Sequence, residues 1–172
     1  MRILIAEDER DIATTYEIAL RERGHDVIIT NDGKSCLEVY HNYQTKHSKE
    51  IESSPRPFDV VILDYKMPKL NGMEVAKEIL KANPKQRIIF VSAYVIDTLE
   101  ESVKELKQVV ELIQKPFEIQ VLLNMIEDKG IFERVQKLMS IVKKIKDPSD
   151  PSETEIMDLF KAVSKAHKGM SF

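Results

Sequence analysis

In Val60-Val-Ile-Leu-Asp64-Tyr-Lys-Met-Pro68 an apolar run ends in a carboxylate and then breaks into a turn, and the rest of the architecture can be worked out from it. Four consecutive apolar residues predict a strand that is buried on both faces of a parallel sheet. Asp64 is therefore expected at the carboxyl edge of that sheet, which is where α/β proteins place their chemistry.

Three other apolar runs also end at a polar residue. Residues 2–6 lead into Glu7 and Asp8, residues 87–91 into Ser92, and residues 109–113 toward Lys115. Taken singly, each of these polar residues is explained more simply by helix capping, by a turn or by surface exposure. Four strand ends of one sheet would nevertheless bring three acids, a hydroxyl and a lysine to one edge, and this joint pattern favours a functional site.

Strand-like runs alternate with segments of helical period from residue 2 to about residue 127. This rhythm predicts five βα units, in which helices cover both faces of a parallel sheet. The expected helices cover residues 11–23, follow Gly33 and Gly72, cover about 97–106, and begin at Glu118. The segment 41–57 is too long and too polar for an ordinary connection between a helix and a strand. An extended helix end and a mobile insertion are therefore expected there.

A different pattern follows Gly130. Apolar residues recur at spacings of four and three from Ile131 to Ile145, residues 147–151 break the helix, and Ser152 with Glu155 forms a capping-box signature for a last helix. The sequence thus predicts a first domain over residues 1–129, with its insertion at 41–57, and a helical extension over 130–172.

Composition limits the class of protein. The chain has 172 residues, a formal net charge of -3 and 32% charged residues, which fits a soluble globular protein with no overall attraction for nucleic acid. Cys36 is the single cysteine, and the amino terminus lacks a long apolar segment. We therefore expect a cytoplasmic protein without membrane attachment.

The residue types at the predicted edge suggest phosphoryl chemistry. Asp8 and Asp64 would repel each other unless a cation lay between them, and Mg²⁺ prefers a few carboxylates together with water and substrate oxygens. With Mg²⁺ and the Lys115 ammonium neutralising charge, an Asp64 oxygen could attack a phosphoryl group while the Ser92 hydroxyl bonds another of its oxygens.

Over residues 2 to about 127 the chain resembles the receiver domain of two-component response regulators. The matching motifs are Ala6-Glu-Asp-Glu9, Ile62-Leu-Asp-Tyr-Lys-Met-Pro68, Asn71-Gly72, Val91-Ser-Ala93 and Gln114-Lys-Pro-Phe117. The sequence departs from the family at Leu112, where receivers usually carry Tyr or Phe, and in the length of the 41–57 insertion.

The resemblance implies a flavodoxin-like sheet with strand order 2-1-3-4-5 and a cis Lys115-Pro116 bond. It also implies a set of site roles: Asp64 as phosphoacceptor, Mg²⁺ held by Glu7, Asp8, Asp64 and the Lys66 carbonyl, Lys115 as phosphoryl contact, and Ser92 as switch hydroxyl. The donor would be a histidine kinase or phosphotransfer protein. The output would be contact with a downstream protein, and the only reactions promoted would be the domain's own phosphorylation and dephosphorylation.

Two other functions compete with this interpretation. Residues 132–146 carry five basic residues against one acidic residue, so this helix could bind DNA in a transcriptional regulator, although such a run is more often a solvated face. A phosphohydrolase of the haloacid dehalogenase type would need a second Asp where Lys66 stands. The apolar stripes of the extension must be covered, and we expect a homodimer interface there, with docking in cis as the alternative.

Overall fold

The structure, a computed structural model of the chain, describes residues 1–47, 56–93, 106, 108, 110–128, 130 and 132–137. Their order is β1 (Arg2–Ala6), α1 (Arg10–Glu22), β2 (Asp26–Thr30), α2 (Gly33–His47), β3 (Val60–Asp64), α3 (Gly72–Ala82), β4 (Ile88–Ser92), β5 (Glu111–Gln114) and α5 (Ile119–Glu127). Of the helix predicted over about 97–106, only Leu106 lies among the described residues.

The strands form one parallel sheet in the order β2-β1-β3-β4-β5, so the predicted flavodoxin-like fold is confirmed. The register aligns their carboxyl ends. Ala6 pairs with Leu63, which brings the residue after β1 level with Asp64. Ser92 pairs with Gln114, which places Lys115 just beyond the same edge.

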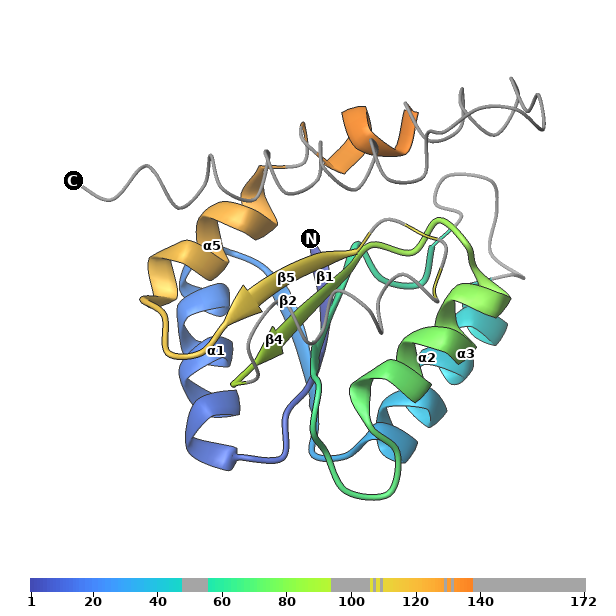
Figure 1. Cartoon of the computed structure of the whole chain (residues 1–172), viewed down its shortest axis with the longest axis horizontal. Helices are drawn as coiled ribbons and strands as arrows, with labels where there is room; N and C mark the ends of the chain where they lie inside the picture. Colours follow the sequence, from blue (N-terminus) through green and yellow to red (C-terminus); the bar gives the residue numbers. More distant parts are fainter. Residues whose placement is uncertain are drawn as a thin grey trace, which may run out of the picture. The chain divides into compact units, whose positions relative to one another are not determined.

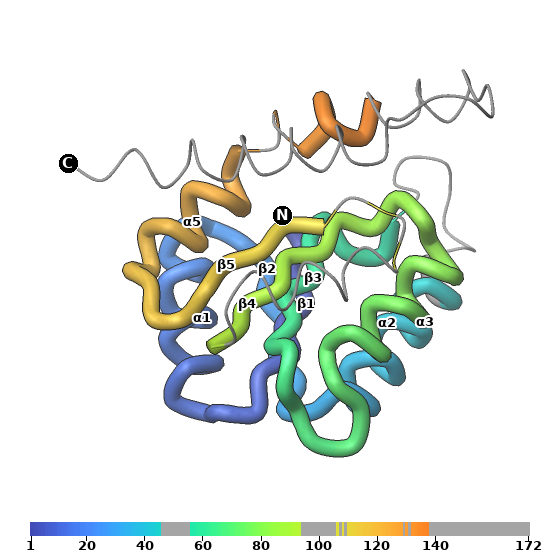
Figure 2. Tube along the Cα trace, in the orientation of Figure 1, coloured from blue at the N-terminus to red at the C-terminus, as the bar shows by residue number. Residues whose placement is uncertain are grey.

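Helices cover both faces of the sheet, with α1 and α5 on one side and α2 and α3 on the other (Figures 1 and 2). Successive side chains of a strand point to opposite faces. On β3, Val61 and Leu63 therefore pack in the core with α2 and α3, whereas Val60 and Ile62 pack in the core with α1 and α5. Burial on both sides explains why β3 reads as an unbroken apolar run.

Helix α2 accounts for part of the predicted insertion, because it continues to His47. Its last turns are held by aromatic contacts: the Tyr43 ring lies 5.1 Å from that of Phe58, and the Arg2 guanidinium lies 5.5 Å from the Tyr43 ring centre. The expected extension of the helix is therefore present. The remainder of the insertion, residues 48–55, lies outside the described residues.

A buried charge lies near the opposite edge of the sheet. Arg87 is only 2% exposed, and its guanidinium binds both carboxylate oxygens of Glu111, at 2.7 and 2.9 Å. It also donates to the carbonyls of Met125 and Ile126 in the last turn of α5. A cation is favourable at the carboxyl terminus of a helix. The Arg87 guanidinium therefore connects α5 to the starts of β4 and β5.

The chain divides into two compact units, Met1–Glu127 and Asp128–Phe172. In the second unit, residues 132–137 are helical. The rest of the predicted stripe to Ile145, the break at 147–151 and the last helix lie outside the described residues. Among the helices that the structure describes, none is both long enough and apolar enough to cross a membrane.

Candidate functional site

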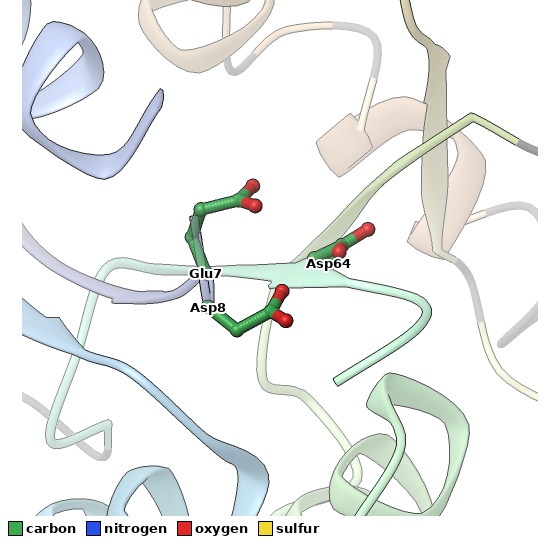
Figure 3. Close-up of side chains that lie close together, drawn as sticks. All are labelled: Glu7, Asp8 and Asp64. Atoms are coloured by element: carbon green, nitrogen blue, oxygen red, sulfur yellow. The ribbon is translucent and has the colours of Figure 1, made fainter. Parts of the chain in front are cut away.

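Three carboxylates meet at the carboxyl edge of the sheet. Glu7 and Asp8 follow β1, and Asp64 ends β3; Figure 3 shows their side chains side by side. One carboxylate oxygen from each lies within 4.8 Å of the others. The convergence predicted for these three residues is therefore present, and the parallel register of β1 and β3 produces it.

Lys115 reaches into this carboxylate cluster from the end of β5. Its Nζ lies 2.8 Å from Glu7 Oε2 and 3.8 Å from Asp64 Oδ1. The backbone also fixes its position, because the Lys115 N–H donates to the Ser92 carbonyl at 2.7 Å and the Lys115-Pro116 peptide bond is cis. One ammonium group thus bridges two carboxylates, one from β1 and one from β3.

Burial makes this charge arrangement unfavourable without a further cation. Glu7 is 1% exposed and Asp64 8%, whereas Asp8 is exposed. Desolvation raises the pKa of Glu7 despite its hydrogen bond to Lys115, and the Asp64 charge raises it further. Desolvation also raises the pKa of Asp64, and this outweighs the opposing effects of Lys115 and of hydrogen bonds from the backbone at Tyr65 and Lys66.

The donor set fits a hard divalent cation. The three acids carry formal charge -3 against +1 from Lys115, and all their free donors are oxygens, which suits Mg²⁺ better than a thiophilic metal. Glu7 Oε1 is buried and has no hydrogen-bond partner within the described part of the chain. A cation at the cluster would satisfy this oxygen and reduce the repulsion that burial intensifies.

The loop between β3 and α3 returns closely onto Asp64. The Gly72 N–H donates to the Tyr65 carbonyl at 2.9 Å, and a Cβ at position 72 would lie 2.2 Å from the Asp64 carbonyl oxygen. Only glycine permits that approach. Asn71 then caps α3 through a reciprocal capping box with Glu74.

The other predicted site residues lie at the same edge. Ser92 is the last residue of β4 and is 1% exposed, while Lys66 lies in the β3–α3 loop with its side chain exposed. The sequence predicted Ser92 just after its strand. In the structure Ser92 is part of β4, because its carbonyl accepts a hydrogen bond from the Lys115 N–H and so continues the pairing of β4 with β5. Leu112 pairs with Phe90 in the sheet and is partly buried.

Tyr16, a buried residue of α1, was not among the predicted site residues. Its ring lies 5.9 Å from that of Phe117, in the segment that follows Lys115. Burial first, and then the charges of Glu7 and Asp64, raise the pKa of its hydroxyl. The helix that carries Tyr16 was predicted over residues 11–23, but the closeness of its hydroxyl to the acids depends on how α1 crosses the sheet.

Comparisons with known proteins agree with this geometry. The family model described as the response regulator receiver domain matches residues 3–127. The response regulator ArlR of Staphylococcus saprophyticus is 30% identical over 172 residues, covering 92% of this chain and 70% of that protein. The DNA-binding transcriptional regulator NtrC of Azospirillum brasilense is 31% identical over 126 residues, covering 73% of this chain but 23% of that protein.

A solved structure is also similar. The crystal structure of a response regulator receiver domain protein from Clostridium thermocellum superposes with a TM-score of 0.62 at 27% identity, covering 78% of this chain and 97% of that one. The family match covers well over half of the chain and includes every element from β1 to α5. The chain therefore belongs to the response regulator receiver domain family of two-component signalling proteins.

Proposed function

We propose that this protein receives a phosphoryl group on Asp64 and signals through the phosphorylated state. The observation that carries the proposal is the cluster in which Lys115 bridges Glu7 and Asp64 beside the exposed Asp8. Asp64 is the member of this cluster that ends the central strand β3, beside Lys115 at the sheet edge.

The proposed donor is a phosphohistidine of a histidine kinase or phosphotransfer protein. A carboxylate oxygen of Asp64 attacks the phosphorus, the P–N bond breaks, and its electron pair returns to the imidazole ring. The product is an acyl phosphate on Asp64 and a free histidine on the donor. Asp64 must be ionised for this attack, and the ammonium of Lys115 favours that form.

The other residues bind the transferred group. Lys115 already lies at the Asp64 carboxylate and contacts a phosphoryl oxygen there. The Ser92 hydroxyl, at the end of the adjacent strand β4, bonds another phosphoryl oxygen and acts as the switch hydroxyl. Glu7, Asp8, Asp64 and the Lys66 carbonyl would hold Mg²⁺, which neutralises charge on the phosphoryl oxygens. Glu7 also keeps the Lys115 ammonium in place.

We place the protein in the cytoplasm, with output through contact with a downstream protein and with homodimerisation through residues 130–172. DNA binding by the basic residues of the stretch 132–146 is the alternative, because one of the similar proteins is a DNA-binding regulator. The two outputs separate in a binding assay, since a phosphate-contacting helix loses affinity steeply as salt increases.

Incubation with acetyl phosphate and Mg²⁺ tests the phosphoacceptor role. The intact mass of the wild type should increase by one phosphoryl group, and Asp64→Asn should remain unlabelled because an amide is not a nucleophile here. Asp11→Asn, which alters an exposed acid on α1, is the matched control and should label normally. Labelling of Asp64→Asn to the wild-type level would refute the assignment.

A further inference from the structure

The β3–α3 loop is held by a contact outside the carboxylate cluster. Lys69, in this loop, places its Nζ 2.6 Å from Asp32 Oδ2, in the turn between β2 and α2. Asp32 has a side chain that is only 4% exposed, whereas that of Lys69 is 59% exposed. No local pattern pairs these residues, since they lie 37 positions apart.

Lys69 has an unusual backbone. Its φ is 70°, in the left-handed region, and the Leu70 N–H donates to the Pro68 carbonyl at 2.9 Å across it. This is a three-residue turn of the rarer, strained kind, and a lysine has no intrinsic preference for it. Such a conformation persists only where the surroundings determine it. The ion pair with Asp32 is a contact that supports it.

Asp32 is itself held firmly. Its Oδ1 accepts from the Ser35 N–H at 2.8 Å and its Oδ2 from the Ser35 hydroxyl at 3.0 Å. Together with Lys69, these donors lower the pKa of Asp32 to about 2. Next to it, a Cβ at Gly33 would lie 2.2 Å from the Leu70 carbonyl, so the loop packs directly on the start of α2.

Strand β2, which precedes this turn, also connects to the carboxylate cluster. The Glu7 N–H donates to the carbonyl of Thr30, two residues before Asp32. The β3–α3 loop is closed by the hydrogen bond from the Gly72 N–H to the Tyr65 carbonyl, and it is held at Lys69 by Asp32. Lys66 lies between the two anchors, one residue before the buried Met67.

We propose that Asp32 and Lys69 are a positioning pair, which fixes the backbone at Lys66 against the carboxylate cluster. The Lys66 carbonyl is then placed to bind Mg²⁺ while Asp64 accepts the phosphoryl group. Neither residue touches the reacting atoms. The pair acts by holding one cation ligand in place, as the supporting partners of metal ligands do. This inference rests on the proposed function, because it assigns the pair to the same site.

Lys69→Met tests the pair, because it keeps an unbranched side chain of similar length and removes the charge. Its Mg²⁺ dissociation constant, from isothermal titration calorimetry, should rise about tenfold, the lower end of the effect of losing such a supporting contact. Phosphorylation by acetyl phosphate should slow equally at low Mg²⁺ and recover at saturating Mg²⁺. Without Mg²⁺, hydrogen exchange of amides 65–71 should be faster.

Three further variants separate positioning from stability. Lys69→Arg should restore Mg²⁺ affinity, since a guanidinium can also bind Asp32. Lys69→Gly should lose affinity like Lys69→Met although glycine relieves the backbone strain and keeps the fold stable. Lys34→Met, which removes an exposed lysine of the neighbouring helix α2, is the matched control and should leave affinity unchanged.

The outcomes also separate the two proposals. If Lys69→Met and Lys69→Gly bind Mg²⁺ with wild-type affinity, or if Lys69→Arg fails to restore it, the positioning role is wrong while Asp64 phosphorylation stands. If the wild type is never labelled on Asp64 although Lys69→Met weakens Mg²⁺ binding, the proposed function fails and the pair remains a metal-positioning device.

Discussion

Removal of one carboxylate from the cluster should stabilise the protein without Mg²⁺ and destabilise it relative to the wild type with Mg²⁺. Asp8→Asn is the cleanest change, because the amide is nearly isosteric with the acid. Asp8 is exposed, and its charge faces Asp64 in the cluster. The substitution therefore acts mainly on electrostatics.

The geometry sets the size of the effect. At 4.8 Å, the bound on the separation of the carboxylate oxygens, two unit charges repel by about 3 kcal/mol at an effective dielectric constant of 20 and about 1 kcal/mol in water. Because Asp8 is exposed, screening favours the lower part of this range, about 1–2 kcal/mol. For a domain of this size, such a gain raises Tm by about 3–8 °C.

Calorimetric scans in EDTA and in Mg²⁺ measure both halves of the prediction. A ligand present at about 100 times its dissociation constant stabilises the folded state by about 2.7 kcal/mol, so Mg²⁺ should raise the wild-type Tm by about 10 °C. Asp8→Asn should melt above the wild type in EDTA and should show little further rise in Mg²⁺.

Asp11→Asn is the matched control. It also removes one negative charge, but from the first turn of α1, where an acid interacts favourably with the helix dipole. It should therefore melt slightly below the wild type in EDTA and keep the Mg²⁺ response. A lower Tm of Asp8→Asn in EDTA, or an undiminished Mg²⁺ response, would refute the paired-carboxylate reasoning.

Three further predictions concern the same edge. Lys115→Met leaves Glu7 buried without its cation and should cost about 2–3 kcal/mol at pH 7.5 in urea denaturation, with Lys115→Arg retaining most of the stability. Gly72→Ala places a methyl group against the Asp64 carbonyl, so we expect a loss of about 1–3 kcal/mol and of acetyl phosphate labelling; retention of both would show that the loop can move aside. Folding raises the pKa values of Glu7 and Asp64, so the folded state binds protons more tightly than the unfolded state. The free energy of unfolding without metal should therefore increase as pH falls through the raised pKa values toward the ordinary carboxyl range near 4. Urea titrations in EDTA should show this gain between pH 7.5 and pH 5, and Glu7→Gln should reduce it; an equal gain in that variant would contradict the origin of the effect.

The fold and the carboxylate cluster were predictable because they depend on local patterns and on one topological rule. The apolar run before Asp64 identifies a buried strand, and parallel strands share their carboxyl edge, so Glu7 and Asp8 must come near Asp64 once β1 and β3 are neighbours. The cis Lys115-Pro116 bond was expected only from the family resemblance, and the structure confirms it.

Contacts between loops were not predictable from these patterns. Lys69 has a left-handed backbone at a position without glycine or asparagine, so no residue type signals the turn. Arg87 looked like the first residue of a strand, but its partners Glu111, Met125 and Ile126 lie far along the chain. In both cases a charged side chain is placed by tertiary packing, which leaves no local periodicity.

The measurement that tests the phosphoacceptor assignment most directly uses the unmodified protein. After incubation with acetyl phosphate and Mg²⁺, borohydride reduction converts an aspartyl phosphate to homoserine, and peptide mass spectrometry then locates the converted residue. We predict homoserine at position 64, dependent on Mg²⁺ and absent from positions 8 and 59. Conversion at Asp8, or at any carboxylate outside the cluster with Asp64 unchanged, would contradict the assignment of Asp64 as the phosphoacceptor.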